Sequence, residues 1–540
     1  MRTRRIGVAA IALAAAGALA LSGCSTGGGS GEATSSASSA IITTNGSEPQ
    51  NPLIPTNTNE TGGGKVTDSI FAGLVYYDAK GKPVNDMAES IKTTDAQNYT
   101  IKIKSGEKFT NGEPVTADSF VKAWNYGAAL DNAQLNSYFF EGIKGFSYDE
   151  NVAELPGLKV VDKTTFTVEL SQPESDFPLR LGYTAFMPLP EAAFKDLKAF
   201  GENPIGNGPY KLASKGAWEH NVKISLVKNK DYKGGRTPKN GGLDIIFYAS
   251  QDASYADLQG GNLDVVDQIP ESALGTYQKD FPDHSVNQAS AIFQSFTIPA
   301  RLPHFGGEEG NLRRQAISEA INRSEITDKI FSGTRTPAHD FTSPVIDGYS
   351  EDLKGSDVLK YNESNAKKLW AQADAISPWS GTFQIAYNAD GGHQGWVDAV
   401  TNNIKNVLGI DASGAPFPTF KQVRDQITNR TIQTAFRTGW QADYPALYNF
   451  LGPIYGTGAG SNDGDYSNPD VDKLLKEGLA ETDTAAANKK FQDAQVILFK
   501  DLPAIPLWYS TVNGAWGDQV QNVQFGWNSV PLYYNITKAE

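Results

Sequence analysis

The stretch of the chain that most constrains its fold reads Phe109-Thr110-Asn111-Gly112-Glu113-Pro114-Val115-Thr116-Ala117-Asp118-Ser119-Phe120. Just before it, residues 99–104 alternate strictly between apolar and polar side chains, which is typical of a half-buried strand. Thr116 suits the N-cap position of a helix that continues through Phe120 and Trp124. The block therefore predicts a strand followed closely by a helix.

Strand-like and helix-like patterns are intermixed along the rest of the chain. Order is expected to begin near Ala40, where a short β-branched run is followed by Asn45-Gly46 as a turn. Further strands are predicted at 165–170, 223–227 and 243–248, and helices at 312–331, 396–408 and 485–499. Gly409 suits the end of the second of these helices. With no repeat at solenoid periods, the pattern predicts an α/β or mixed α+β protein, without saying which strands pair.

Composition and charge limit the class of protein. The chain has 540 residues, of which 39% are hydrophobic and 20% charged. This predicts a soluble protein with more than one domain, because a single hydrophobic core stops growing well below this length. The formal net charge of −14 argues against nucleic-acid binding, which needs clustered Lys and Arg.

The N-terminus predicts export and lipid anchoring. Basic residues at positions 2, 4 and 5 precede an apolar, Ala-rich run from 6 to 21, which is too short for a convincing membrane span. The run ends at Leu21-Ser22-Gly23-Cys24, which resembles the bacterial lipobox, and Cys24 is the only cysteine of the chain. We therefore predict a signal peptide at 1–23, lipidation of Cys24 and a Ser/Gly-rich tether over 24–40. The alternative is an ordinary secretory signal with an incidental cysteine.

Short catalytic signatures are missing from the sequence. It contains no Walker A loop, no His-Glu-x-x-His and no Gly-x-Ser-x-Gly, and its five histidines lack metal-ligand spacing. The loop Ser461-Asn462-Asp463-Gly464-Asp465 weakly suggests calcium but lacks the later bidentate Glu, so a solvated turn is favoured. We predict no catalytic residue, no metal and no cofactor. A secreted hydrolase remains open as an alternative, because glycosidases also lack short signatures.

Several separated blocks resemble the oligopeptide- and dipeptide-binding proteins that serve ABC importers (extracellular solute-binding proteins, family 5). The matching blocks, in family order, are 46–53, 71–78, 88–90, 109–120, 203–212, 313–317, 439–445 and 466–469. The resemblance implies a two-lobed, periplasmic-binding-protein-like fold with a hinge, one lobe being split into two domains. It implies three domains in all: domain I (41–75, 208–295 and 509–540), domain II (76–207) and domain III (296–508).

The resemblance also implies the residues that contact the ligand: Asp443, Trp440, Arg437, Tyr138, His393, Gln441 and Tyr444. Asp443 is expected to pair with the α-amino group of a peptide, since a carboxylate in a closed cleft needs a cation. Its alternative role is a local cap of Tyr444-Pro445. Trp440 would form a wall, or equally pack in the core, and Tyr138 would reach the ligand.

The other end of the ligand is expected near Arg437 and His393. A guanidinium suits a ligand carboxylate or its bridging water, whereas His393 follows a Gly391-Gly392 loop that differs from the family and could be exposed. Gln441 departs from some relatives and would alter the polarity of the pocket.

These observations together predict a monomeric solute-binding lipoprotein on the extracytoplasmic face of the cell membrane. It would capture short peptides between its lobes and deliver them to ABC transporter permease subunits, without performing chemistry. The alternatives are the same fold for an oligosaccharide or a metal chelate, a secreted hydrolase, or a surface protein without a closing cleft.

Overall fold

The computed structural model describes residues 39–538. The predicted signal peptide, Cys24 and the tether up to residue 38 lie outside the described residues. Strand β1 (Ile41–Gly46) begins close to the predicted onset of order, and the Ala40 carbonyl already accepts a hydrogen bond from the Gly241 N–H at 2.8 Å.

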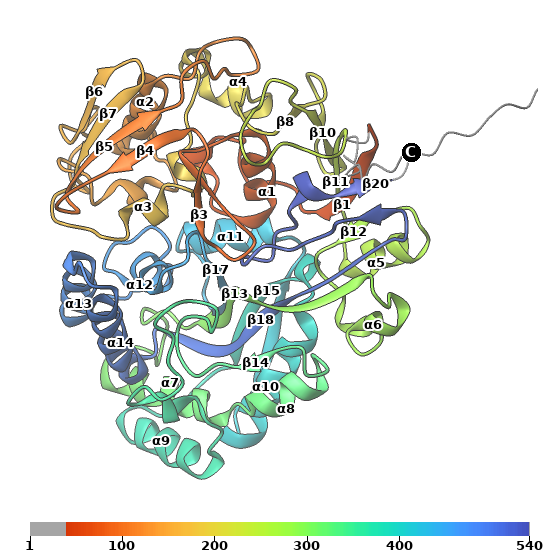
Figure 1. Ribbon diagram of the computed structural model, residues 1–540. Helices are drawn as coiled ribbons and strands as arrows, with labels where there is room; N and C mark the ends of the chain where they lie inside the picture. The colour runs from red at the N-terminus through yellow and green to blue at the C-terminus, as the bar shows by residue number, and fades with distance from the viewer. Residues whose placement is uncertain (1–38, 539–540) are drawn as a thin grey trace, which may run out of the picture. The chain divides into compact units, whose positions relative to one another are not determined.

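A mixed sheet of twelve strands runs through the described part of the chain (Figure 1). Its two longest strands, β13 (Ser285–Thr297) and β18 (Ala504–Trp516), pair antiparallel from Ser285↔Ala515 to Thr297↔Ala504. On one side of this pair lie β17 (Ala435–Gln441), β15 (Phe383–Asn388) and β16 (Ala412–Phe417). On the other side lie, in order, β12 (Val265–Val266), β1, β11 (Gly242–Phe247), β10 (Lys223–Lys228) and β8 (Tyr210–Leu212). The long pair therefore connects the two halves of the sheet.

Two short strands complete the twelve-stranded sheet: β14 (Thr336–Pro337) lies beside β18, and β9 (Trp218–Glu219) lies beside β10. Two small antiparallel pairs lie outside it, β2 (Val75–Tyr77) with β3 (Pro83–Asn85), and β19 (Val520–Gln521) with β20 (Thr537–Lys538).

The block quoted first connects one strand of a separate four-stranded sheet to the helix that follows it. The order is β4 (Ala88–Lys92), β5 (Asn98–Ile103), β7 (Thr165–Glu169) and β6 (Leu158–Asp162). Along β5 exposed and buried residues alternate, as predicted. Helix α2 (Ala117–Ala128) starts after Thr116, whose backbone N–H donates to the Ser119 hydroxyl at 3.2 Å. The strand and the helix predicted from this block are both confirmed.

The remaining helices pack around these sheets. Their bounds are α1 Thr61–Ile70, α3 Phe177–Arg180, α4 Leu197–Glu202, α5 Gln251–Gln259, α6 Tyr277–Asp280, α7 Gly307–Ala320, α8 Arg323–Lys329, α9 Glu363–Ile376, α10 Gln394–Leu408, α11 Phe420–Thr428, α12 Leu447–Tyr455, α13 Pro469–Ala480 and α14 Thr484–Asp501. Helix α10 ends at Gly409, whose φ of 68° is the left-handed conformation that glycine adopts readily. The predicted helices at 396–408 and 485–499, and the mixed α/β class, are confirmed.

Two local predictions are wrong. The single helix expected at 312–331 is broken into α7 and α8, because the Asn322 side chain caps α8 by accepting the Glu325 N–H at 3.2 Å. Asn45-Gly46 is not a turn but the end of β1, in register with Ile246 and Phe247. The Asn45 amide donates to Asp267 at 2.9 Å, a partner 222 residues away, so tertiary contacts override the local turn preference.

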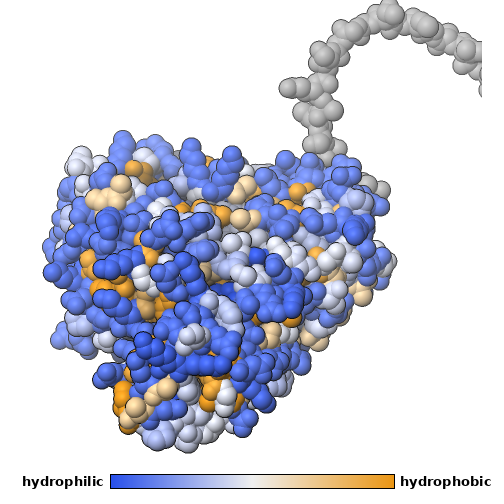
Figure 2. Space-filling model, turned by 90° about the horizontal axis from the view of Figure 1, so that it is seen from below, coloured by the Kyte–Doolittle hydropathy of each residue, from blue (hydrophilic) through white to orange (hydrophobic). Residues whose placement is uncertain are grey.

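The face shown in Figure 2 is covered mostly by hydrophilic residues, and its apolar residues form small separated spots. Within residues 39–538, no helix has the length and apolar character needed to cross a membrane.

Candidate functional site

Asp443 lies just beyond the end of β17, in the short connection to α12. Strand β17 is fixed by its pairing with β13, where Trp440 faces Phe293 in register. The fully buried Asn449 of α12 then binds this connection at three points. Its Oδ1 accepts from the Asp443 backbone N–H at 2.8 Å and from Trp440 Nε1 at 3.1 Å, and its Nδ2 donates to Asp443 Oδ2 at 2.8 Å. The orientation of the Asp443 carboxylate is therefore set by the fold.

Burial makes the Asp443 carboxylate a poor place for an isolated negative charge. Burial raises its pKa to about 7, although hydrogen bonds from Asn449 and from the Tyr183 hydroxyl favour the charged form. Within residues 39–538, no Lys, Arg or His forms an ion pair with it. The carboxylate also does not cap the Tyr444-Pro445 backbone, which was the local alternative. A cationic group of a ligand would supply the missing partner.

A cluster of aromatic side chains lies beside this carboxylate and includes Tyr183 and the adjacent Tyr444. The ring of Phe139 lies 4.6 Å from that of Tyr138, 4.4 Å from that of Tyr183 and 6.4 Å from that of Tyr444. Tyr138 and Tyr444 are 5% and 1% exposed, so both pack more deeply than a purely ligand-facing side chain would. Tyr138 also lies directly over Gly460, where a Cβ would come within 2.5 Å of its ring.

Arg437 and His393 meet at a second place, at the carboxyl end of β15. The Arg437 Nε donates to Asn388 Oδ1 at 3.0 Å, and its guanidinium lies 5.2 Å from the centre of the Phe420 ring. Burial lowers the Arg437 pKa to about 10, against the opposing charge of Asp390. His393 is partly buried rather than exposed, and its Nδ1 accepts from Trp396 Nε1 at 3.1 Å. Burial, and then the charge of Arg437, hold the His393 pKa well below its usual value, so the site favours the neutral imidazole.

Trp440 and Gln441 have partners within the protein. Trp440 is partly buried and directs its indole N–H to Asn449. The Gln441 side-chain amide donates to the Asn528 carbonyl, in the C-terminal segment of the chain. Gln441 therefore joins residues that are distant in sequence, beside the position of Asp443.

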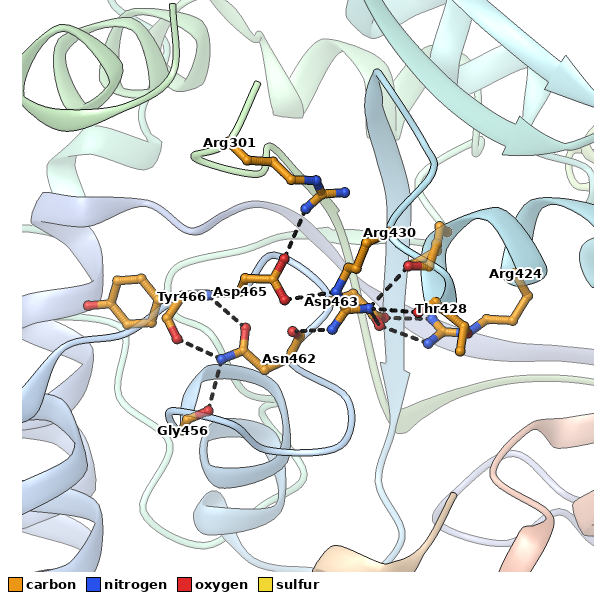
Figure 3. A network of polar contacts seen from close by, with 10 residues as sticks. Arg301, Arg424, Thr428, Arg430, Gly456, Asn462, Asp463, Asp465 and Tyr466 are labelled. Atoms are coloured by element: carbon orange, nitrogen blue, oxygen red, sulfur yellow. Dashed lines mark hydrogen bonds and ion pairs between the residues drawn. The ribbon is translucent and has the colours of Figure 1, made fainter. Parts of the chain in front are cut away.

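The acidic loop at 461–465 is held by arginines (Figure 3). Asp463 accepts from both terminal nitrogens of Arg424, at 2.6 and 2.8 Å, and Asp465 accepts from Arg430 at 2.8 Å and from Arg301 at 3.2 Å. Asp463 is 7% exposed, so the expectation of a solvated turn is wrong for this residue, because the arginines from neighbouring elements bury it. Both Asp463 oxygens are committed to guanidinium groups, and no group of three or more metal-type ligands occurs within residues 39–538.

Sequence reasoning missed Asn449 and Tyr183, the two residues that bind the Asp443 carboxylate. Neither stands in a motif. Tyr183 is 260 positions away in the chain, and Asn449, although only six positions from Asp443, is brought to the carboxylate by the turn into α12. Two surface cavities, of about 500 and 540 Å³, are lined by other residues, mainly around α2 and α13.

Comparison with known proteins identifies the family. The family model of the bacterial extracellular solute-binding proteins, family 5 (middle), matches residues 82–462. The oligopeptide-binding protein OppA of Bacillus subtilis is 26% identical over 478 residues, which is 85% of each chain. The dipeptide-binding protein DppE of the same organism is 27% identical over 473 residues, or 84% of each chain.

Solved structures show the same fold. Haemophilus influenzae OppA in complex with the peptide RPPGFSPFR has a TM-score of 0.82 at 22% identity, covering 93% of this chain and 99% of that one. The Escherichia coli murein tripeptide-binding protein MppA has a TM-score of 0.83 at 21% identity, over 93% and 98% of the two chains. The predicted two-lobed, multi-domain fold is confirmed, and the family consists of binding proteins rather than enzymes. The chain belongs to the bacterial extracellular solute-binding proteins of family 5.

Proposed function

We propose that this protein is a lipid-anchored, monomeric solute-binding protein that captures short peptides between its lobes and delivers them to an ABC transporter permease. The observation that carries the proposal is Asp443: a rigidly oriented, partly buried carboxylate with no cationic partner among the described residues, in a chain of this family. A peptide ammonium supplies both the charge and the hydrogen bonds that such a carboxylate needs. The relatives named for peptides support this ligand class.

The peptide would lie with its amino end at Asp443 and its carboxyl end toward Arg437. Arg437 has no carboxylate at ion-pair distance among the described residues, so a ligand carboxylate could form an ion pair with its guanidinium. Trp440, Gln441, Tyr444, Tyr138 and His393 would line or support this path. Protein backbone would hold the peptide as an added strand, and no bond in the ligand would be broken.

The three-domain division belongs to the same proposal. The proposed boundaries at 295/296 and 508/509 fall within β13 and β18, the two strands that connect the halves of the main sheet. Paired crossing strands of this kind suit a hinge between lobes.

Native mass spectrometry of the full chain, purified from its own cells, tests the proposal. We expect additional species whose excess masses correspond to intact short peptides, because a closed cleft retains its ligand through purification. Recovery of a sugar or a metal chelate instead would contradict the peptide assignment. Cleaved products of an added intact peptide would contradict the absence of catalysis.

Lipid anchoring is tested separately at Cys24. Replacement of the only cysteine by alanine (Cys24→Ala) is expected to move the protein from the membrane fraction to the medium, or to leave it unprocessed, because the acylated thiol is lost. Cell fractionation with immunoblotting measures this. Complete membrane retention of a processed Cys24→Ala protein, from which the leader has been removed, would contradict the anchor.

A further inference from the structure

One short segment, residues 174–183, contacts the region around Asp443 at several points. We call it the docking segment; it contains α3 and lies in the proposed domain II, more than 250 positions before Asp443. The Tyr183 hydroxyl hydrogen-bonds the Asp443 carboxylate. At the other end of the docking segment, the Ser175 hydroxyl donates at 2.8 Å to the carbonyl of Glu481, at the end of α13. The docking segment therefore follows the surface that runs from Asp443 to α13.

Arg180 forms the centre of this contact. Its Nη1 lies 2.8 Å from Glu174 Oε2 and its Nη2 donates to Asp176 Oδ1 at 2.8 Å, so both ion pairs are made within the docking segment. The guanidinium thus has a fixed orientation and lies over the ring of Tyr444 at 5.9 Å and over the ring of Tyr448 at 5.4 Å. Arg180 is only 3% exposed, and a cation over aromatic faces gains most where water is excluded.

A hydrogen bond beside Arg180 also joins the proposed domain II to α12. The Tyr448 hydroxyl donates to Glu141 Oε1 at 3.0 Å, across 307 positions of sequence. The other oxygen of this carboxylate, Oε2, accepts from the Tyr148 hydroxyl at 2.7 Å, seven positions away. Glu141 therefore accepts one hydrogen bond from a tyrosine close to it in sequence and one from a tyrosine of α12. The same helix carries Asn449, which binds Asp443.

We infer that the docking segment, with Glu141, positions Asp443 for the ligand and sets how long a bound peptide is retained. The inference rests on the proposed function. The β17–α12 connection and helix α12 carry Asp443, Tyr444 and Tyr448. Tyr183 of the docking segment contacts Asp443, and Arg180 contacts the rings of Tyr444 and Tyr448. In the proposed division the docking segment and Glu141 belong to domain II and α12 to domain III, so these contacts oppose separation of the two domains. Their loss is expected to raise the dissociation rate and to leave the association rate nearly unchanged.

Two matched substitutions test the inference in the full chain. Tyr448→Phe removes the hydroxyl that reaches Glu141 from α12, and Tyr148→Phe removes the hydroxyl that reaches the same carboxylate from nearby. The ring that remains at position 448 can still pack on Phe491, which is 5.8 Å from the Tyr448 ring. With RPPGFSPFR and trialanine as probes, stopped-flow fluorescence should show a dissociation rate raised about tenfold in Tyr448→Phe. The association rate should change less than about twofold, and Tyr148→Phe should resemble the unmodified protein in both rates.

The outcomes separate this inference from the proposed function. If the unmodified protein binds neither probe, the proposed ligand class is in doubt, and the same variants are compared by amide hydrogen exchange at residues 444–455. Faster exchange in Tyr448→Phe than in Tyr148→Phe then supports the docking role without a ligand. Equal dissociation rates, or equal exchange where neither probe binds, would overturn it. A fall in melting temperature in Tyr448→Phe with no change in dissociation would show a merely structural hydrogen bond, and would also overturn it.

Discussion

Asp443→Ala is expected to weaken peptide binding by well over tenfold. The fold holds this carboxylate in one orientation through Asn449, and burial raises its pKa to about 7 because no cation of the described protein compensates the charge. A peptide ammonium would be the compensating charge, and removing one partner of such a buried pair costs about 2–5 kcal/mol, partly because the other charge is left unpaired. At about 1.4 kcal/mol per factor of ten, this exceeds tenfold in affinity.

The charge and the shape of Asp443 can be tested independently. Asp443→Asn keeps the shape of the side chain and loses its charge, so its affinity should resemble that of the alanine variant. An N-acetylated peptide should bind the unmodified protein much more weakly than the same peptide with a free amino terminus, because acetylation removes the ammonium. Isothermal calorimetry with RPPGFSPFR, its acetylated form and the two variants measures these differences. Equal affinity for the free and acetylated peptides would show that Asp443 does not recognise an amine.

Gly206→Ala is expected to destabilise the protein by about 3 kcal/mol or more, the upper end of the usual cost of overpacking. A Cβ at Gly206 would lie 1.9 Å from the Ile70 carbonyl oxygen, a backbone atom at the end of α1 that no side-chain rotation can move away. The next residue fixes this approach, because the Asn207 side chain accepts from the Ala72 N–H and donates to the Ala72 carbonyl, each at 3.0 Å. We therefore expect the free energy of unfolding of Gly206→Ala to be lower than that of the unmodified protein.

Gly64→Ala is the matched control, because it lies in α1 itself. A Cβ at Gly64 would meet no atom within 4 Å, and alanine favours a helix interior over glycine by roughly 1 kcal/mol. Urea unfolding followed by circular dichroism should show Gly64→Ala to be as stable as the unmodified protein or slightly more stable. A Gly206→Ala variant with the same stability as the Gly64→Ala variant would contradict the close approach at Ile70.

The elements with strong local signals could be predicted from the sequence. Strand β5 shows strict alternation, and α10 combines apolar periodicity with a terminal Gly409, so each is specified by side chains within a few residues of one another. The prediction at Asn45-Gly46 failed for the opposite reason: Asn45 is bound by Asp267, 222 positions away, and this long-range partner outweighs a local turn preference. The break between α7 and α8 is local, because Asn322 caps a new helix through the Glu325 N–H three positions later, and the apolar periodicity did not register this cap.

The residues of the candidate site likewise fall into those that the sequence identified and those that only the tertiary structure identified. The sequence by itself determined the family and, through the matching block at 439–445, the candidate carboxylate Asp443. Only the tertiary structure decided that Asn449 orients this carboxylate, that Tyr183 donates to it, and that Arg180 lies over the neighbouring tyrosines. The physical reason is distance along the chain: Tyr183 and Arg180 come more than 250 positions before Asp443 and Tyr444, and only the packing of α3 against the β17–α12 connection brings them together. Burial, and with it the raised pKa of Asp443, is likewise a property of that packing rather than of any local run of residues.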